Sequence, residues 1–228
     1  MRFAIHESAS KGSPEALQAL IFAMAKLMES RCPETGLHLE RVREYTRILA
    51  QHVAANSEKI ILVDFAETVS LASVLHDIGM VSLPDSILLS KTHLTLRQQA
   101  TMQLHTVLGG EALSMALSMH PSDQYTLMAR DIAMYHHERY DGQGYPMGLA
   151  GMEIPLAARI VSVADAYDAM TTTRSYHDAM PHHMAHTVIE AGKGKQFDPV
   201  VVEAFMAREQ EISMVRNRFN AQPIPMAA

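Results

Sequence analysis

The 228-residue chain contains no tryptophan and only one cysteine, Cys32. A single cysteine excludes an internal disulfide framework. No apolar stretch approaches the ~20 residues that are needed to span a bilayer. Lysine and arginine number 19 against 25 acidic residues, so the formal net charge is −6, and no long basic run is present. The composition therefore argues against a membrane protein and against binding of duplex nucleic acid or an anionic membrane surface.

The N-terminus lacks the basic and then apolar pattern of a secretory signal peptide. Together with the scarcity of cysteine, this favours a reducing, cytoplasmic location. Nothing near Cys32 indicates a lowered thiol pKa, so we expect a structural role for it. The 17 methionines are interpreted as packing residues, because methionine is a flexible filler of helical cores.

Apolar residues recur mostly at helical spacing, which predicts an all-α fold with few strands. Ser13 and Pro14 suit the cap and first position of a helix. We expect a leader over residues 1–13, one domain over 14–215 and a tail over 216–228. The expected helices begin at residue 14, continue with one that ends near Ala55, and then cover 64–77, a short turn after Pro84, 96–118, 123–138, 155–171, 181–192 and 198–213.

Three local features carry further structural expectations. The first helix has an apolar stripe that we expect to be buried, formed by Leu17, Leu20, Ile21, Met24, Leu27 and Met28. Gly79 suits a left-handed exit from the third helix. The segment "DGQGYPMGLAG" at 141–151 has four glycines and a proline, which predicts a loop.

The chain has 13 histidines, several of them next to acidic residues. His76 and Asp165 follow apolar runs, where an unpaired charge would cost several kcal/mol. Imidazoles and carboxylates without thiolates favour Fe, Mn or Zn bound through nitrogen and oxygen. The candidate ligands exceed the needs of one ion, which argues for at least two; they are Glu34, His38, His76, Asp77, His105, His136, His137 and Asp165.

A second group of histidines has a simpler interpretation. His182, His183 and His186 lie at the start of an expected helix, and no acidic residue is close to them in sequence. We therefore expect a solvated helix face at this position.

Several segments together resemble the HD-GYP family of metal-dependent phosphohydrolases, which degrade the bacterial second messenger cyclic di-GMP. They are "ETGLH" at 34–38, "VLHDIG" at 74–79, "LHTVLGGEAL" at 104–113, "HHERYDGQGYPMGLAGMEIPLAARIVSVADAYDAMT" at 136–171 and "GKQFDPVVVEAF" at 194–205. The resemblance covers roughly residues 15–210. It implies an HD-domain helical bundle with a glycine-rich GYP loop.

The resemblance also implies roles for individual residues. His38, His76, Asp77 and Asp165 correspond to the ligands of one ion, and Asp77 would bridge to a second ion held by His105, His136 and His137. Glu34 matches a glutamate that helps to hold a third ion in some members. Arg174 corresponds to an arginine that faces the substrate phosphate, and Tyr145 lies on the signature loop, on the side of the substrate or of a protein partner.

The implied reaction is the hydrolysis of cyclic di-GMP to pGpG and then to GMP, with two or three divalent ions as cofactors. Two ions ~3.5 to 4 Å apart can hold a bridging hydroxide in line with a phosphodiester phosphorus. The sequence departs from the family at Met80, where a lysine usually contacts the phosphate. Loss of one charge-assisted contact would cost ~1.5 to 3 kcal/mol, which slows turnover about tenfold to a hundredfold without abolishing it.

Two alternatives stay open beside cyclic di-GMP hydrolysis. The same machinery could act on another cyclic dinucleotide such as 3′,3′-cGAMP. The substitution at Met80 also fits a weakly active sensor or interaction module, in which the GYP loop docks to a diguanylate cyclase (GGDEF) partner.

Overall fold

The computed structural model describes residues 13–31, 37–57, 63–90, 92–173 and 178–220. These residues form a helical bundle, and no strand occurs among them; two isolated bridges pair Asp141 with Ala150 and Lys193 with Phe197. The all-α class is therefore confirmed. The helices are α1 (Pro14–Glu29), α2 (His38–Ala55), α3 (Phe65–Ser73), η1 (Ile78–Ser82), α4 (Asp85–Leu88), α5 (Leu96–Met119), α6 (Gln124–Tyr135), η2 (Gly151–Glu153), α7 (Leu156–Thr171), α8 (His182–Ala191), α9 (Pro199–Ala207) and α10 (Glu209–Asn220).

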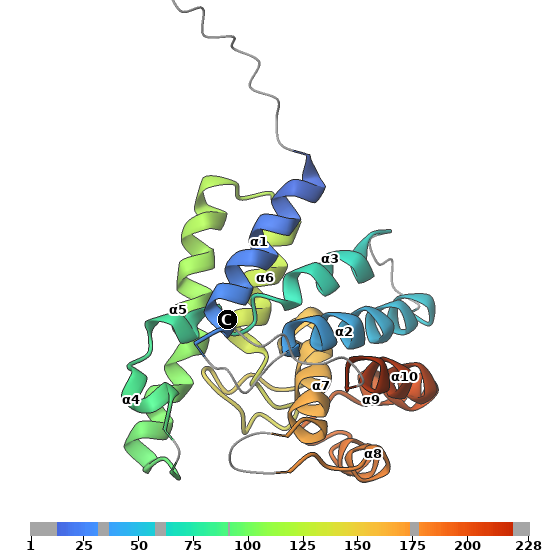
Figure 1. Ribbon diagram of the computed structural model, residues 1–228. Helices are drawn as coiled ribbons and strands as arrows, with labels where there is room; N and C mark the ends of the chain where they lie inside the picture. The colour runs from blue at the N-terminus through green and yellow to red at the C-terminus, as the bar shows by residue number, and fades with distance from the viewer. Residues whose placement is uncertain (1–12, 32–36, 58–62, 91, 174–177, 221–228) are drawn as a thin grey trace, which may run out of the picture.

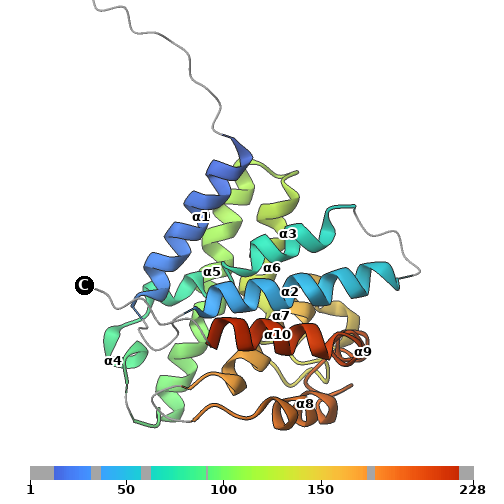
Figure 2. The ribbon, with the colours of Figure 1, turned by 45° about the vertical axis from the view of Figure 1, so that its right-hand side comes forward.

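Helix α2 occupies the middle of the bundle (Figures 1 and 2) and packs against α3, α7, α9 and α10. Tyr45 of α2 meets Tyr167 of α7 edge-on, with ring centroids 5.1 Å apart, and both side chains are almost fully buried. Phe205 of α9 lies against the same Tyr167 at 5.2 Å. Edge-to-face aromatic pairs of this kind stabilise beyond the area that they bury. They fix α2 and α7, the helices that carry His38 and Asp165.

The first helix differs from expectation. Its N-terminus is capped as predicted, because the Ser13 side chain accepts a hydrogen bond from the Ala16 amide. The apolar stripe, however, is not buried as a whole: the exposed fractions are 59% for Leu17, 58% for Leu20 and 73% for Leu27, and Met24 is exposed as well. Two members of the stripe do pack inward as expected, because Met28 is buried and Ile21 lies against the core, and Ala25 and Phe22 pack beside them. Helix α1 is apolar on two faces, so its periodicity did not show which face packs inward.

The helical exit expected at Gly79 was wrong. Helix α3 ends at Ser73, and Gly79 lies inside η1 with no positive φ. A Cβ atom at Gly79 would lie 2.0 Å from the His105 carbonyl oxygen and 2.6 Å from the Gly109 amide nitrogen. Glycine is therefore required here by the close approach of η1 to α5, which brings Asp77 next to His105.

The C-terminal helix was also expected in a different form. The predicted helix over 198–213 is two helices, because the backbone leaves the helical conformation at Arg208 (φ −114°, ψ 18°). This break lets Phe205 of α9 and Ile212 of α10 both reach the core. Helix α10 continues to Asn220, beyond the residue at which we expected the periodicity to end. Within the described part of the chain, no helix has the length and apolarity to cross a membrane.

Candidate metal centre

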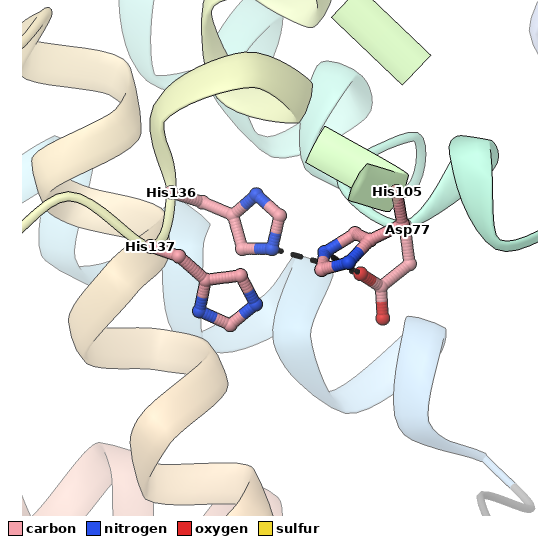
Figure 3. Close-up of side chains that lie close together, drawn as sticks. All are labelled: Asp77, His105, His136 and His137. Carbon is pink, nitrogen blue, oxygen red and sulfur yellow. Dashed lines mark ion pairs between the residues drawn. The ribbon is translucent and has the colours of Figure 1, made fainter. Parts of the chain in front are cut away.

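Seven of the eight expected ligands converge in two groups. One group contains Asp77, His105, His136 and His137, and the other contains His38, His76 and Asp165; within each group, one ligand atom from every residue lies within 4.8 Å of the others. Figure 3 shows the first group, in which the three imidazoles and the carboxylate face a common point. The eighth expected ligand, Glu34, lies outside the described residues.

Asp77 connects the two groups. Its Oδ1 lies 3.2 Å from His105 Nε2 and 3.6 Å from His136 Nε2, while its Oδ2 lies 3.4 Å from His76 Nε2. In the second group, His38 Nε2 is 3.2 Å from His76 Nε2. Asp165 Oδ1 is 3.8 Å from the first of these nitrogens and 3.9 Å from the second. One carboxylate therefore faces both clusters of imidazoles.

The local structure aims the ring nitrogens. His76 Nδ1 donates to the Ser73 carbonyl at 2.8 Å, and His105 Nδ1 donates to the Met102 carbonyl at 2.7 Å. His136 Nδ1 donates to the Ile132 carbonyl at 3.0 Å. In each case the acceptor lies three or four residues earlier in the chain. Because Nδ1 donates its proton to a carbonyl, Nε2 is the ring nitrogen that faces the centre and is placed to bind a cation.

Two buried atoms lack partners in this arrangement. His105 Nε2 and His136 Nε2 are buried and make no hydrogen bond. A buried polar atom without a partner costs ~1 to 3 kcal/mol, and here both atoms point toward the same carboxylate. Burial lowers the pKa of His136 and, more strongly, that of His137. Neutral imidazoles beside a carboxylate match the donor set that divalent transition metals prefer, so these residues fit a metal ion.

Protons and cations would compete at the junction of the groups. Burial alone would lower the pKa of His76, but the charge of Asp77 outweighs it and raises the pKa to about 9. Burial acts in the opposite sense on Asp77, yet the charge of His76 and the neighbouring imidazoles hold the pKa of Asp77 well below its usual range. A cation that binds here has to displace the proton of His76.

Tyr145 lies at the edge of the first group. Its ring stacks on the ring of His137, with centroids 4.9 Å apart and an angle of 26° between the planes. Burial, followed by the charges of Asp77 and Asp165, raises the pKa of the Tyr145 phenol, so the hydroxyl keeps its proton. The predicted loop over 141–151 is observed, and Tyr145 presents its ring to the metal centre from this loop. Arg174, the other expected substrate contact, lies outside the described residues.

Two buried acidic residues beside the site were missed. Asp168, one turn after Asp165 on α7, contacts His38 Nδ1 at 2.8 Å and is 1% exposed. Glu138, directly after the histidine doublet, accepts hydrogen bonds from the amides of three loop residues at 2.7 to 3.1 Å, namely Met147, Gly148 and Leu149. Both residues lie in the segment 136–171 that was quoted above. The sequence feature that could have revealed them is an acidic residue inside a segment that is otherwise expected to be buried.

The histidines at the start of α8, which are His182, His183 and His186, were only partly understood from the sequence. His183 is exposed, as expected. His182, however, is hydrogen-bonded between the Tyr167 hydroxyl at 2.8 Å and Glu209 of α10 at 3.1 Å. The acidic partner that seemed to be missing comes from a helix more than twenty residues later. His182 therefore ties α7, α8 and α10 together, and a solvated face describes only part of this helix.

The chain is similar to a known domain family and to several named proteins. The family model described as "HD domain" matches residues 23–201. A protein of Thermotoga maritima named "Cyclic di-GMP phosphodiesterase" is 40% identical over 192 residues, which cover 84% of this chain and 49% of that protein. A protein of Vibrio cholerae named "3'3'-cGAMP-specific phosphodiesterase 2" is 36% identical over 203 residues, which cover 89% of this chain and 37% of that protein.

The chain thus spans half or less of the length of each of these relatives. The fold also resembles that in a crystal structure of a cyclic GMP-AMP-specific phosphodiesterase of V. cholerae. The TM-score is 0.58 at 16% identity, and the match covers 91% of this chain and 54% of that one. The family match extends over more than three quarters of the sequence and includes all seven converging ligands. The chain belongs to the HD domain family.

Proposed function

We propose that the chain, and within it the domain over residues 14–215, is a metal-dependent phosphodiesterase of the HD-GYP branch that hydrolyses cyclic di-GMP to pGpG and GMP. The observation that carries this proposal is the convergence of five imidazoles and two carboxylates from distant segments into two adjacent groups. Relatives that share 34 to 41% of their residues with this chain include several named as cyclic di-GMP phosphodiesterases. The name of the substrate comes from these relatives, while the donor set supports metal-assisted hydrolysis.

The residues that would hold the cations are His38, His76, Asp77, His105, His136, His137 and Asp165. Glu34 is proposed as a ligand of a third ion. Nitrogen and oxygen donors without thiolates favour Fe or Mn, with Zn as a further candidate. Bound divalent cations lower the pKa of water into the neutral range and offset the charge of a phosphodiester.

The chain itself supplies orientation and substrate contacts. Backbone carbonyls fix the tautomers of His76, His105 and His136, and Asp77 faces both groups of ligands. We assign Tyr145 to the substrate side of the centre, because its protonated hydroxyl belongs to a ring that lies on His137. Arg174 is proposed to contact the substrate phosphate. We also propose a cytoplasmic location, where the enzyme would have direct access to this substrate.

The test is a hydrolysis assay with purified protein that has been loaded with Fe²⁺ or Mn²⁺ under reducing conditions. Cyclic di-GMP is incubated with the wild type and with Asp77→Asn, and the products are separated by liquid chromatography. We expect pGpG from the wild type and at most a trace from the variant. Metal-loaded wild type that leaves cyclic di-GMP intact would overturn the proposal.

A second candidate substrate is 3′,3′-cGAMP, because a relative with 36% identity is named as specific for it. The same assay with both dinucleotides at equal concentration decides between them through the ratio of kcat/KM values. A third candidate function, a weakly active sensor whose GYP loop binds a diguanylate cyclase, is favoured by Met80. Tight dinucleotide binding without product in fully metal-loaded protein would support it.

A further inference from the structure

His38 is held differently from the other ligands of the centre. For His76, His105 and His136, the acceptor of the Nδ1 proton is a backbone carbonyl of the preceding turn. For His38 the acceptor is the Asp168 carboxylate at 2.8 Å, on a helix 130 residues later in the chain. Four imidazoles thus present Nε2 to the centre, and only one of them depends on a side chain to do so.

The position of His38 explains the difference. His38 is the first residue of α2, so no preceding turn of that helix offers it a carbonyl. Helix α7 packs beside α2 and carries two acidic residues one turn apart. Asp165 lies near His38 Nε2, whereas Asp168 contacts His38 Nδ1. The two carboxylates of α7 therefore serve opposite edges of the same ring.

The Asp168 carboxylate is itself fixed by Arg41, one turn after His38 on α2. Its Oδ1 accepts from Arg41 Nε at 2.5 Å, and its Oδ2 accepts from Arg41 Nη2 at 3.0 Å as well as from His38. A buried carboxylate in a two-point contact with arginine has little freedom to rotate.

We propose that Asp168 is a positioning residue, clamped by Arg41, that holds His38 in the tautomer and orientation in which Nε2 binds a metal ion. The inference rests on the proposed metal-dependent function of the centre. Asp168 belongs to neither of the two ligand groups. It acts on the affinity of the His38, His76 and Asp165 group, as carboxylates that hydrogen-bond to metal-binding histidines do in general.

The test compares Asp168→Asn with Asp198→Asn. In the first variant the Arg41 guanidinium retains the single amide oxygen, so the amide NH₂ faces His38 and favours the tautomer with the proton on Nε2. The control removes a similar pair: Asp198 is 2% exposed and is bound by Arg159, which lies on the same helix α7. Neither Arg159 nor Asp198 belongs to the two ligand groups. Asp198 also caps α9 by accepting a hydrogen bond from the Val200 amide at 2.8 Å, and an asparagine can keep this cap, so the control reports the effect of the lost buried ion pair.

The readout is metal content, not turnover. Each protein is dialysed against a series of free Mn²⁺ concentrations, and bound manganese per chain is measured by elemental analysis. We expect Asp168→Asn to bind one ion 10- to 100-fold more weakly and to lose the electron paramagnetic resonance signal of a coupled Mn pair. Asp198→Asn should keep both ions. Equal Mn²⁺ affinity in the two variants, whether retained or lost, would overturn the proposal.

A measurement on the wild type covers the case in which Asp168→Asn does not fold. Nitrogen NMR of ¹⁵N-histidine-labelled, metal-free protein reports which ring nitrogen carries the proton, and the His38 signal is assigned by its absence in His38→Gln. We expect the proton of His38 on Nδ1; a proton on Nε2 contradicts the inference. These readouts do not depend on the substrate, so wild type that binds manganese but leaves cyclic dinucleotides intact refutes only the proposed function.

Discussion

The ring of Tyr145 stacks on the ring of His137, with centroids 4.9 Å apart and an angle of 26° between the planes. This contact joins the glycine-rich loop to a candidate metal ligand. The buried Glu138 carboxylate also fixes the loop, because it accepts hydrogen bonds from three of the loop's backbone amides. The loop and the histidine doublet therefore form one unit, and a substitution in the loop should change metal binding at the candidate centre.

Substitution of Tyr145 separates the roles of ring and hydroxyl. Tyr145→Phe keeps the stack on His137, so we expect unchanged metal content and kcat, with KM raised about tenfold through loss of a substrate hydrogen bond. Tyr145→Ala also removes the stack and should weaken metal retention. Steady-state kinetics and elemental analysis on the same preparations check both points. If Tyr145→Phe had the same KM as the wild type, the Tyr145 hydroxyl would not bind the substrate.

The shared position of Asp77 predicts unequal effects of ligand removal. Asp77 faces both groups, whereas His105 faces only one of them. Asp77→Ala should therefore lose both ions, and His105→Ala should retain one. Elemental analysis after dialysis at a fixed free Mn²⁺ concentration gives the stoichiometry. Substitution of the exposed His183, which belongs to neither group, is the matched control. Two ions retained in Asp77→Ala would contradict the bridging assignment.

The sequence predicted the class of the fold and picked out the seven described candidate ligands that converge in space, because helical periodicity and buried acidic or imidazole residues both leave local signals. It did not predict the support of His38. Asp168 stands in the same apolar run as Asp165, but only the packing of α7 on α2 shows that the two carboxylates face opposite edges of one imidazole. The partner of His182 was missed for a related reason, since Glu209 is close in space and distant in sequence.

Gly79 is visible in the sequence as a glycine after an expected helix, but the structural reason that we inferred for it was wrong. A glycine after a helix usually marks a left-handed exit, yet the reason here is the approach of α5 to η1. Contacts between helices that are far apart in the chain leave no periodicity in the sequence, so local rules assign such a glycine to a local cause.

Gly79→Ala should destabilise the protein and weaken the first ligand group. The new methyl group would lie 2.0 Å from the His105 carbonyl oxygen, and this oxygen belongs to the backbone of α5. The helix has to move, so we expect a loss of at least ~2 kcal/mol in the free energy of unfolding, together with weaker metal binding. Urea denaturation and manganese titration measure the two effects.

Gly194→Ala is a suitable control for this change. Gly194 has φ +72°, and no heavy atom lies within 4 Å of the position that an alanine methyl group would take there. The variant should therefore lose only ~1 kcal/mol through backbone strain and keep its metal affinity. If Gly79→Ala were no more disruptive than this control, the close approach would not be the reason for glycine at position 79.

A charge introduced on the two apolar faces of α1 should change the stability of the protein to very different extents. Leu27 is 73% exposed and Ala25 is fully buried. Leu27→Glu should change the free energy of unfolding by no more than ~0.5 kcal/mol, whereas Ala25→Glu places a charge in the core and should cost several kcal/mol. Urea denaturation at two protein concentrations checks both variants. A large loss with Leu27→Glu would show that the outer face is covered in solution.

Met80 offers the most direct test of the phosphate contact. It lies in η1, three residues after Asp77, and Arg31 anchors this segment through the Met80 and Val81 carbonyls at 3.3 and 2.6 Å. Since these contacts use the backbone, a new side chain leaves them intact. A lysine at position 80 adds a charged donor for a phosphodiester, so Met80→Lys should raise kcat/KM for cyclic di-GMP about tenfold to a hundredfold at unchanged metal content. Met119→Lys, on the exposed end of α5, adds the same charge elsewhere and controls for general attraction of an anionic substrate. An equal gain in both variants, or none in Met80→Lys, would show that position 80 does not limit phosphate binding.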